Sequence, residues 1–281
     1  MDTRRRISGM DGWVSACVML VLFFLPTICQ ASRISLELSV EINTQDKTWS
    51  GHVLATNRGD EAAYDLQASL KALGSEKRSS IVKQLEAGKT WETEIPILEV
   101  MDPQIMPGRY PAILQVSYTD SNGHPFSALT VNFFEVHEAI VSQISGELQA
   151  TPISGKGRLI LKLQNMDESP IEASVQLVFP RELVPDRYEE KIRVNARDSV
   201  TINRQVRNLS ALPGSQYPVF SIIEYDKDGT HFSSKAMATL NIAEPVGLVR
   251  SMRVPLLVVL GILVAVVIVL QFRHRRREKG A

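Results

Sequence analysis

One pattern occurs twice in this chain, 107 residues apart, and it restricts the fold more than any other feature. Residues 107–111 read Pro-Gly-Arg-Tyr-Pro, and residues 213–218 read Pro-Gly-Ser-Gln-Tyr-Pro. Eight residues after each Tyr comes another, at Tyr118 and Tyr225. An offset of 107 residues is the size of a whole domain rather than of a solenoid unit. The sequence therefore predicts two copies of one domain.

The apolar residues of each copy alternate with polar residues, as they do in strands with one buried face. Residues 36–42 and 159–163 show this alternation. Asp-Ser-Asn-Gly at 120–123 and Asp-Lys-Asp-Gly at 226–229 predict hairpin turns, because Asn, Asp and Gly readily adopt a positive φ. Short strands separated by such turns are typical of antiparallel β-sandwiches.

We therefore expect an all-β chain with two tandem immunoglobulin-like β-sandwiches. Their predicted ranges are 33–137 and 138–245, with the junction at His137-Glu138. No stretch between residues 33 and 245 has an apolar stripe of helical period and length. The Asn-Arg-Gly-Asp turn at 57–60, the Leu-Glu-Ala-Gly-Lys step at 85–89 and the closing hairpin resemble the bacterial immunoglobulin-like modules of the CARDB and NEW3 type.

The resemblance covers most of both repeats, and its motifs are turn and core residues. The second copy departs from it at Met166-Asp167, where the glycine is missing. The resemblance implies a surface or periplasmic protein that acts as a spacer, an adhesion module or a companion of carbohydrate-active enzymes. It carries no catalytic residues that could be transferred to this chain.

The N-terminus has the pattern of a secretory signal peptide, predicted at 1–31. Three arginines at 4–6 precede a charge-free run from Gly12 to Gln30, and small residues precede a cleavage site after Ala31. Two alternatives stay open: an uncleaved anchor helix, although Pro26 interrupts the run, and a lipoprotein acylated at Cys29, although the bulky Ile28 is unusual there.

A second charge-free segment, 254–272, is long enough to cross a bilayer as a helix. Five basic residues follow it in the tail 273–281, whereas only Arg250 and Arg253 closely precede it. By the positive-inside rule, this bias predicts a single-pass type I membrane protein with a cytoplasmic C-terminus.

Both cysteines, Cys17 and Cys29, fall in the predicted signal peptide, so the predicted ectodomain has no thiol. An exported region of this size without disulfides favours a bacterial or archaeal envelope protein, periplasmic or extracellular. The whole chain has 31 basic and 31 acidic residues, but the segment between the signal peptide and the tail has a net charge of about −5. A mildly acidic body argues against a nucleic-acid partner.

Catalytic motifs occur only as fragments. Residues 88–90 read Gly-Lys-Thr without the upstream glycine of a phosphate-binding loop, and Ser80 and Lys83 form Ser-x-x-Lys without a following Lys-Thr-Gly. The predicted ectodomain has four histidines, none spaced as paired metal ligands: His52, His124, His137 and His231. We expect His124 and His231 to lie on the repeated hairpin. The sequence thus predicts no enzyme, and no catalytic, cofactor-binding or metal-binding residues.

The acidic turns at Asp120/Asn122 and Asp226/Asp228 leave two interpretations open. Each supplies at most two oxygen ligands and lacks the distal bidentate Glu of a self-contained calcium loop. The ligand number favours a plain hairpin turn over a calcium site.

These features predict a non-enzymatic, membrane-anchored protein whose tandem ectodomain binds or scaffolds another envelope or surface component. The alternative is a carbohydrate-binding or enzyme-assisting module that acts on surface or cell-wall glycans. That alternative requires an exposed aromatic platform, and Trp49 and Trp91 are the two candidate residues for it.

Overall fold

The computed structural model describes residues 33–45, 48–98, 105–137 and 139–244, together with isolated positions between 255 and 269. The predicted signal peptide, 1–31, and the predicted tail, 273–281, lie outside the described residues. So does most of the predicted span, 254–272. Within the part of the chain that is described, no helix has the length and apolar character needed to cross a membrane.

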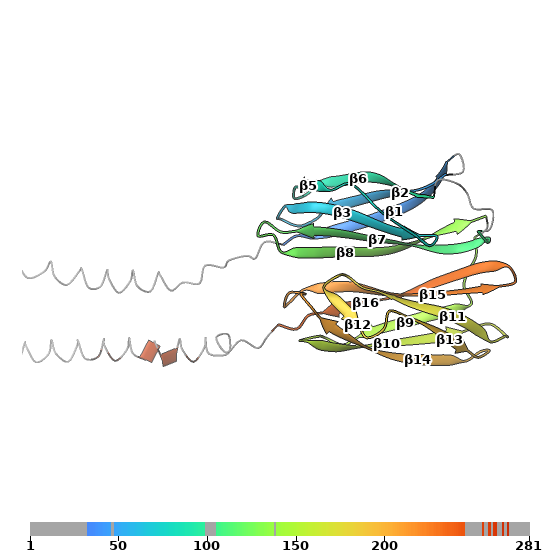
Figure 1. Cartoon of the computed structure of the whole chain (residues 1–281). Helices are drawn as coiled ribbons and strands as arrows, with labels where there is room; N and C mark the ends of the chain where they lie inside the picture. Colours follow the sequence, from blue (N-terminus) through green and yellow to red (C-terminus); the bar gives the residue numbers. More distant parts are fainter. Residues whose placement is uncertain are drawn as a thin grey trace, which may run out of the picture. The chain divides into compact units, whose positions relative to one another are not determined.

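The described elements are β-strands, which confirms the all-β expectation (Figure 1). Eight strands form the first half: β1 (Leu36–Gln45), β2 (Thr48–Asn57), β3 (Ala63–Ala72), β4 (Ser75–Arg78), β5 (Val82–Leu85), β6 (Thr90–Leu98), β7 (Gly108–Thr119) and β8 (Pro125–Val136). Eight form the second half: β9 (Ile144–Ala150), β10 (Lys156–Asn165), β11 (Ile171–Val178), β12 (Leu183–Pro185), β13 (Glu189–Val194), β14 (Ser199–Asn208), β15 (Gln216–Lys227) and β16 (Thr230–Asn241).

The first half is a sandwich of two antiparallel sheets. One sheet has the order β1-β2-β6, and the other contains β3, β4, β5, β7 and β8. Along β2 every second residue is buried, as a strand with one face on a core requires. Val53 and Ile95 of the first sheet pack in one apolar cluster with Leu70 and Leu114 of the second. We call this half sandwich 1.

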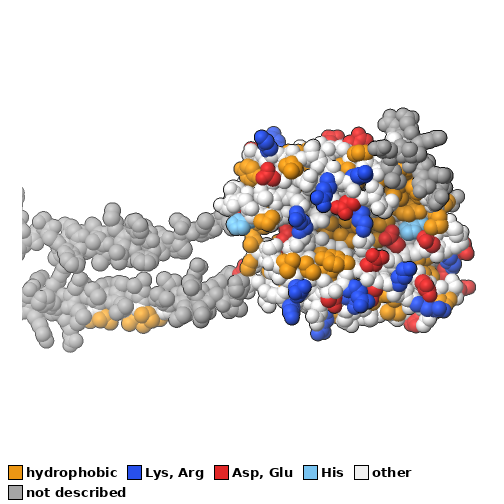
Figure 2. Space-filling model, viewed as in Figure 1, with side chains coloured by type: hydrophobic (Ala, Val, Ile, Leu, Met, Phe, Trp, Pro, Cys, Tyr) orange, Lys and Arg blue, Asp and Glu red, His pale blue; other side chains and the backbone are white. Residues whose placement is uncertain are grey.

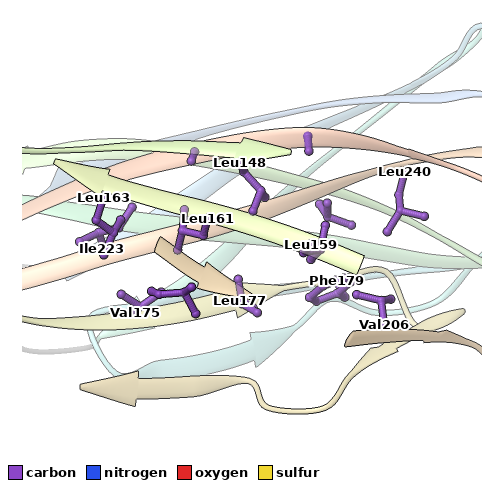
Figure 3. Packing of buried hydrophobic residues seen from close by; sticks show 14 of the residues in the cluster. Leu148, Leu159, Leu161, Leu163, Val175, Leu177, Phe179, Val206, Ile223 and Leu240 are labelled. Carbon is purple, nitrogen blue, oxygen red and sulfur yellow. The ribbon is translucent and has the colours of Figure 1, made fainter. Parts of the chain in front are cut away.

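The second half, sandwich 2, repeats this plan. One sheet has the order β12-β14-β10-β9, and the other runs β13-β11-β15-β16. Through one bridge from β16 to β7, this second sheet continues into the β7-containing sheet of sandwich 1, so that nine of the described strands form one sheet. Leu159, Leu161 and Leu163 of β10 all point into the core, where they meet residues of the opposite sheet such as Val175 and Ile223 (Figure 3). The alternation predicted for residues 159–163 is therefore present, with the apolar side chains buried.

The segment between the two sandwiches is short. β8 ends at Val136 and β9 begins at Ile144, and His137 has a left-handed backbone with φ of 70°. Both sandwiches belong to one compact unit that begins at Ile34. Specific contacts join them, and these contacts build the candidate site.

Candidate functional site

The two sandwiches meet at a backbone bridge between β7 and β16. Gly108 and His231 pair as parallel neighbours, and the His231 N–H donates a hydrogen bond of 2.9 Å to the Pro107 carbonyl. Gly108 has φ of 152°, and a Cβ atom built on it would lie 2.1 Å from the His231 carbonyl oxygen. Only glycine fits such an approach of two backbones.

The His231 side chain extends this contact. Its ring stacks on Tyr110, with the centroids 4.2 Å apart and the planes at 11°. Nδ1 lies 2.6 Å from a carboxylate oxygen of Asp226, and Nε2 lies 3.2 Å from one of Glu224. Burial lowers the pKa of the imidazole, but the bonds to Glu224 and Asp226 outweigh it and hold that pKa above its ordinary value. The junction thus favours a protonated ring against Tyr110.

A buried carboxylate makes the second contact. Glu182 is 2% exposed and belongs to sandwich 2, and it accepts hydrogen bonds from the N–H and the hydroxyl of Ser127, at 2.5 and 2.7 Å. The Arg181 N–H donates to the same Ser127 hydroxyl at 2.9 Å. Burial, with Glu182 adding repulsion, raises the pKa of the Tyr118 hydroxyl. Since a buried carboxylate is costly without donors, Ser127 and Glu182 hold each other in place.

The serine that follows the repeated Phe serves the junction in both sandwiches. In sandwich 1 it is Ser127, described above, and in sandwich 2 it is Ser233, which donates to the Arg109 carbonyl at 2.7 Å. Both side chains are buried. Buried side chains of both sandwiches also form one apolar cluster, made of Ile113, Leu129, Val131, Val178, Phe220 and Ile222.

A groove of about 710 Å³ opens beside this junction. We call it the junction groove. Strands β1, β8 and β16 and the start of β7 line it. The lining residues are 40–43, Arg109, 132–134, Ser234 and Lys235. Two of these side chains are cationic and one, Glu41, is acidic.

The two cations of the groove share one aromatic ring. The guanidinium carbon of Arg109 lies 4.4 Å from the centroid of Phe133, and the Lys235 ammonium lies 5.7 Å from it. Lys235 also donates to the Val131 carbonyl. Burial, and then the charge of Arg109, lowers the pKa of Lys235. The groove can therefore hold an anionic group between two positive side chains.

The predicted hairpin turns are present, and the carboxylate of Asp120 is used within its own turn. Asp228 and Gly229 have positive φ between the paired ends of β15 and β16. The Asp120 carboxylate accepts the N–H groups of Asn122 and His124 at 2.8 and 2.9 Å. Slight burial acts to raise the pKa of this carboxyl, but these bonds bring it below its ordinary value. Among the described residues, no three metal-ligating side chains gather in one place.

The two tryptophans proposed for a glycan platform lie against the core of sandwich 1. Trp49 is 4% exposed, and its ring is 5.7 Å from that of Phe134. Trp91 is partly buried and packs against the same apolar cluster. Trp49 therefore does not offer the open aromatic face that sugar stacking requires.

Sequence reasoning missed Arg109, Glu182 and Lys235, which come from separate strands or loops and share no spacing. It placed His231 on the hairpin correctly, but not against Tyr110, because a contact between distant segments leaves no local pattern. The one available signal was Gly108, since a repeated glycine at the start of a strand indicates a close backbone approach.

No protein-family model matches the chain, and no curated protein matches it by sequence. Among solved structures it is similar to Escherichia coli alpha-2-macroglobulin in its native conformation, with 13% identity, a TM-score of 0.31, and coverage of 75% of this chain but 17% of the other. It is also similar to red sea bream transglutaminase, with 11% identity, a TM-score of 0.27, and coverage of 77% and 32%.

A third similar structure is a Porphyromonas gingivalis W83 protein of unknown function, with 14% identity and a TM-score of 0.28, and here the match covers 73% of this chain and 99% of the other. The chain thus spans less than a third of the length of the macroglobulin and about a third of the transglutaminase. At TM-scores this low, the similarities carry no argument about function.

Proposed function

We propose that this chain is a non-enzymatic, single-pass membrane protein of a bacterial or archaeal envelope, whose two sandwiches act together to bind or scaffold another envelope component. We further propose that the sandwiches are immunoglobulin-like modules of the CARDB and NEW3 type. Under this proposal residues 1–31 are removed on export, segment 254–272 anchors the chain, and the tail 273–281 remains in the cytoplasm.

The observation that carries the proposal is the junction. The Gly108–His231 bridge, the Tyr110–His231 stack and the Ser127–Glu182 bonds fasten sandwich 2 to sandwich 1. A mere spacer needs no such contacts, because tandem domains on a tether keep their distance without them. Fastened domains present one continuous surface, which suits a partner that touches both.

Charge on the visible surface also suits a protein partner better than a polyanion. On the face shown in Figure 2, Lys and Arg side chains are interspersed with Asp and Glu. Such a mixture gives no extended positive field on that face for nucleic acid. The burial of Trp49 weighs against the glycan-binding alternative.

The first experiment tests topology. Compartment reporters fused after Val246 and after Ala281 should report opposite sides of the membrane. Reports from the same side would refute the anchored arrangement.

The second experiment tests binding. A photo-crosslinking residue placed at exposed Met237 of sandwich 2, and another at exposed Ile81 of sandwich 1, should each give discrete adducts with one envelope protein in intact cells. Glycan-array binding with no protein adduct at either position would favour the alternative function.

A further inference from the structure

We propose that the junction groove binds an acidic peptide segment in an extended conformation, with its carboxylates against Arg109 and Lys235. This inference rests on the proposed binding function and names the class of partner for one part of the surface.

The groove carries two neighbouring positive charges. Elsewhere, half-buried cations have carboxylate partners: Arg204 pairs with Glu190, and Lys227 lies 2.5 Å from Asp167. The half-buried Arg109 and the exposed Lys235 beside it have no ion pair with any described residue, although they lie close enough for one charge to depress the pKa of the other. Two like charges held together favour a bound anion, which relieves their repulsion.

Arg109 has an unused hydrogen-bond donor. Its Nε atom is buried and has no hydrogen-bond partner among the described residues. Its planar guanidinium suits the two oxygens of a carboxylate. The Phe133 ring lies against this group, and an aromatic ring has no oxygen that could accept the Nε–H.

Two strand edges lie beside these cations. Among the described strands, β1 pairs only with β2 and β8 only with β7, so each has one edge without a ladder partner in this part of the chain. At the groove the two edges are bridged by a side chain instead: Asn132 Nδ2 donates to the Val40 carbonyl at 3.0 Å. Strand edges with free main-chain groups recognise extended peptides. A sugar would need an aromatic face, and the Phe133 ring already faces Arg109.

The test uses the full-length chain in detergent micelles and a fluorescein-labelled octapeptide in which Thr and Glu alternate. Fluorescence anisotropy should show binding that weakens as salt rises. Lys235→Gln should weaken it about tenfold, as expected for the loss of one charged contact. Arg109→Gln should weaken it at least as much. A matched control, Lys162→Gln, removes an exposed lysine of β10 outside the groove and should leave binding unchanged.

Several results would overturn the inference: no binding of the Thr-Glu peptide by the wild-type chain, equal binding of a Thr-Gln peptide, or unchanged binding by Lys235→Gln. Tighter binding of heparin that also depends on Lys235 would assign the groove to an anionic glycan instead. Lys235 is exposed, so its variant tests the groove even if Arg109→Gln fails to fold. The two proposals can also fail separately. If no form of the chain binds the peptide, but the crosslinked adducts persist in Lys235→Gln, this inference is refuted and the proposed function stands.

Discussion

Sandwich 1 and sandwich 2 use the same buried asparagine in the same way. In sandwich 1, Asn57 donates from Nδ2 to the carbonyls of Glu61 and Leu85, and its Oδ1 accepts the Gly59 N–H. In sandwich 2, Asn165 donates to the carbonyls of Ser169 and Val194, four and 29 residues onward, and accepts the Asp167 N–H. Both residues are at most 1% exposed. Each asparagine thus supplies main-chain groups with the hydrogen bonds that secondary structure would otherwise provide. We call the turn that it holds, after β2 in sandwich 1 and after β10 in sandwich 2, the corner of that sandwich.

The comparison also explains why the second copy needs no glycine after its asparagine. Gly59 is not among the residues with positive φ, whereas Gly88, which follows in the same corner, has φ of 73°. Asp167 can therefore replace Gly59 without strain. The junction also uses residues of the repeated pattern, since Gly108 and Tyr110 of sandwich 1 meet His231 of sandwich 2. The asparagines maintain the fold of each copy, and other repeated residues join the two domains.

The largest effect should come from removing the shared asparagines. Asn57→Ala leaves three main-chain groups without their side-chain partner, and Asn165→Ala leaves four, because Asn165 also donates to the Asn195 carbonyl. In each case one of these groups, the Leu85 or the Val194 carbonyl, is buried. Each should lower the free energy of unfolding by about 2–4 kcal/mol. Urea unfolding of the full-length chain measures this. Asn203→Ala, on an exposed position of β14, serves as the control. A loss in one sandwich with none in the other would contradict their equivalence.

The next largest effect should come from Gly108. In Gly108→Ala the new Cβ would meet the His231 carbonyl at 2.1 Å, so β7 and β16 must separate. We expect a loss of about 2 kcal/mol and faster hydrogen exchange at the His231 amide, which bonds to Pro107. Gly155→Ala is the matched control, because an added Cβ there meets nothing within 4 Å. Unchanged exchange in Gly108→Ala would show that the bridge does not hold the sandwiches together.

Local sequence patterns predicted individual strands and turns, but not the contacts between the two sandwiches. A few neighbouring residues are enough to predict a strand or a turn. This holds for the alternation at Leu159, Leu161 and Leu163 and for the turns at Asp120 and Asp228. Trp49 was expected as a possible platform, yet it lies in the core, because burial depends on which face of β2 meets the opposite sheet. The junction joins Ser127 to Glu182 across 55 positions. Neither a period nor a motif reports such a contact.

A smaller effect should appear with pH. Because hydrogen bonds to Glu224 and Asp226 raise the pKa of folded His231, their contribution is complete below the pKa of an unfolded histidine and is lost as pH rises through the folded value. The loss should be about 1 kcal/mol, the difference between a charge-assisted and a neutral hydrogen bond.

The measurement is the exchange of the His231 amide, corrected for intrinsic rates, between pH 6 and pH 9. Protection should fall toward high pH in the wild type and in His124→Gln, where an exposed histidine is removed. His231→Gln should abolish the dependence. A pH effect that survives in His231→Gln would assign it to another group.

The smallest effect should come from the left-handed residue of each corner. Gly88 in sandwich 1 and Arg197 in sandwich 2 both have positive φ, 73° and 54°. An L-residue pays a steric penalty in this region, and Arg197 gains little in return, since its ion pair with Glu168 is exposed. Arg197→Gly should therefore raise the free energy of unfolding by about 0.5–1 kcal/mol, and Gly88→Ala should lower it by a similar amount. Arg193→Gly, a position in β13 with an exposed ion pair, should destabilise instead, because glycine weakens an extended strand. If Arg197→Gly destabilised the chain as Arg193→Gly does, the two corners would not share one backbone, and the equivalence of the two sandwiches would be limited to their asparagines.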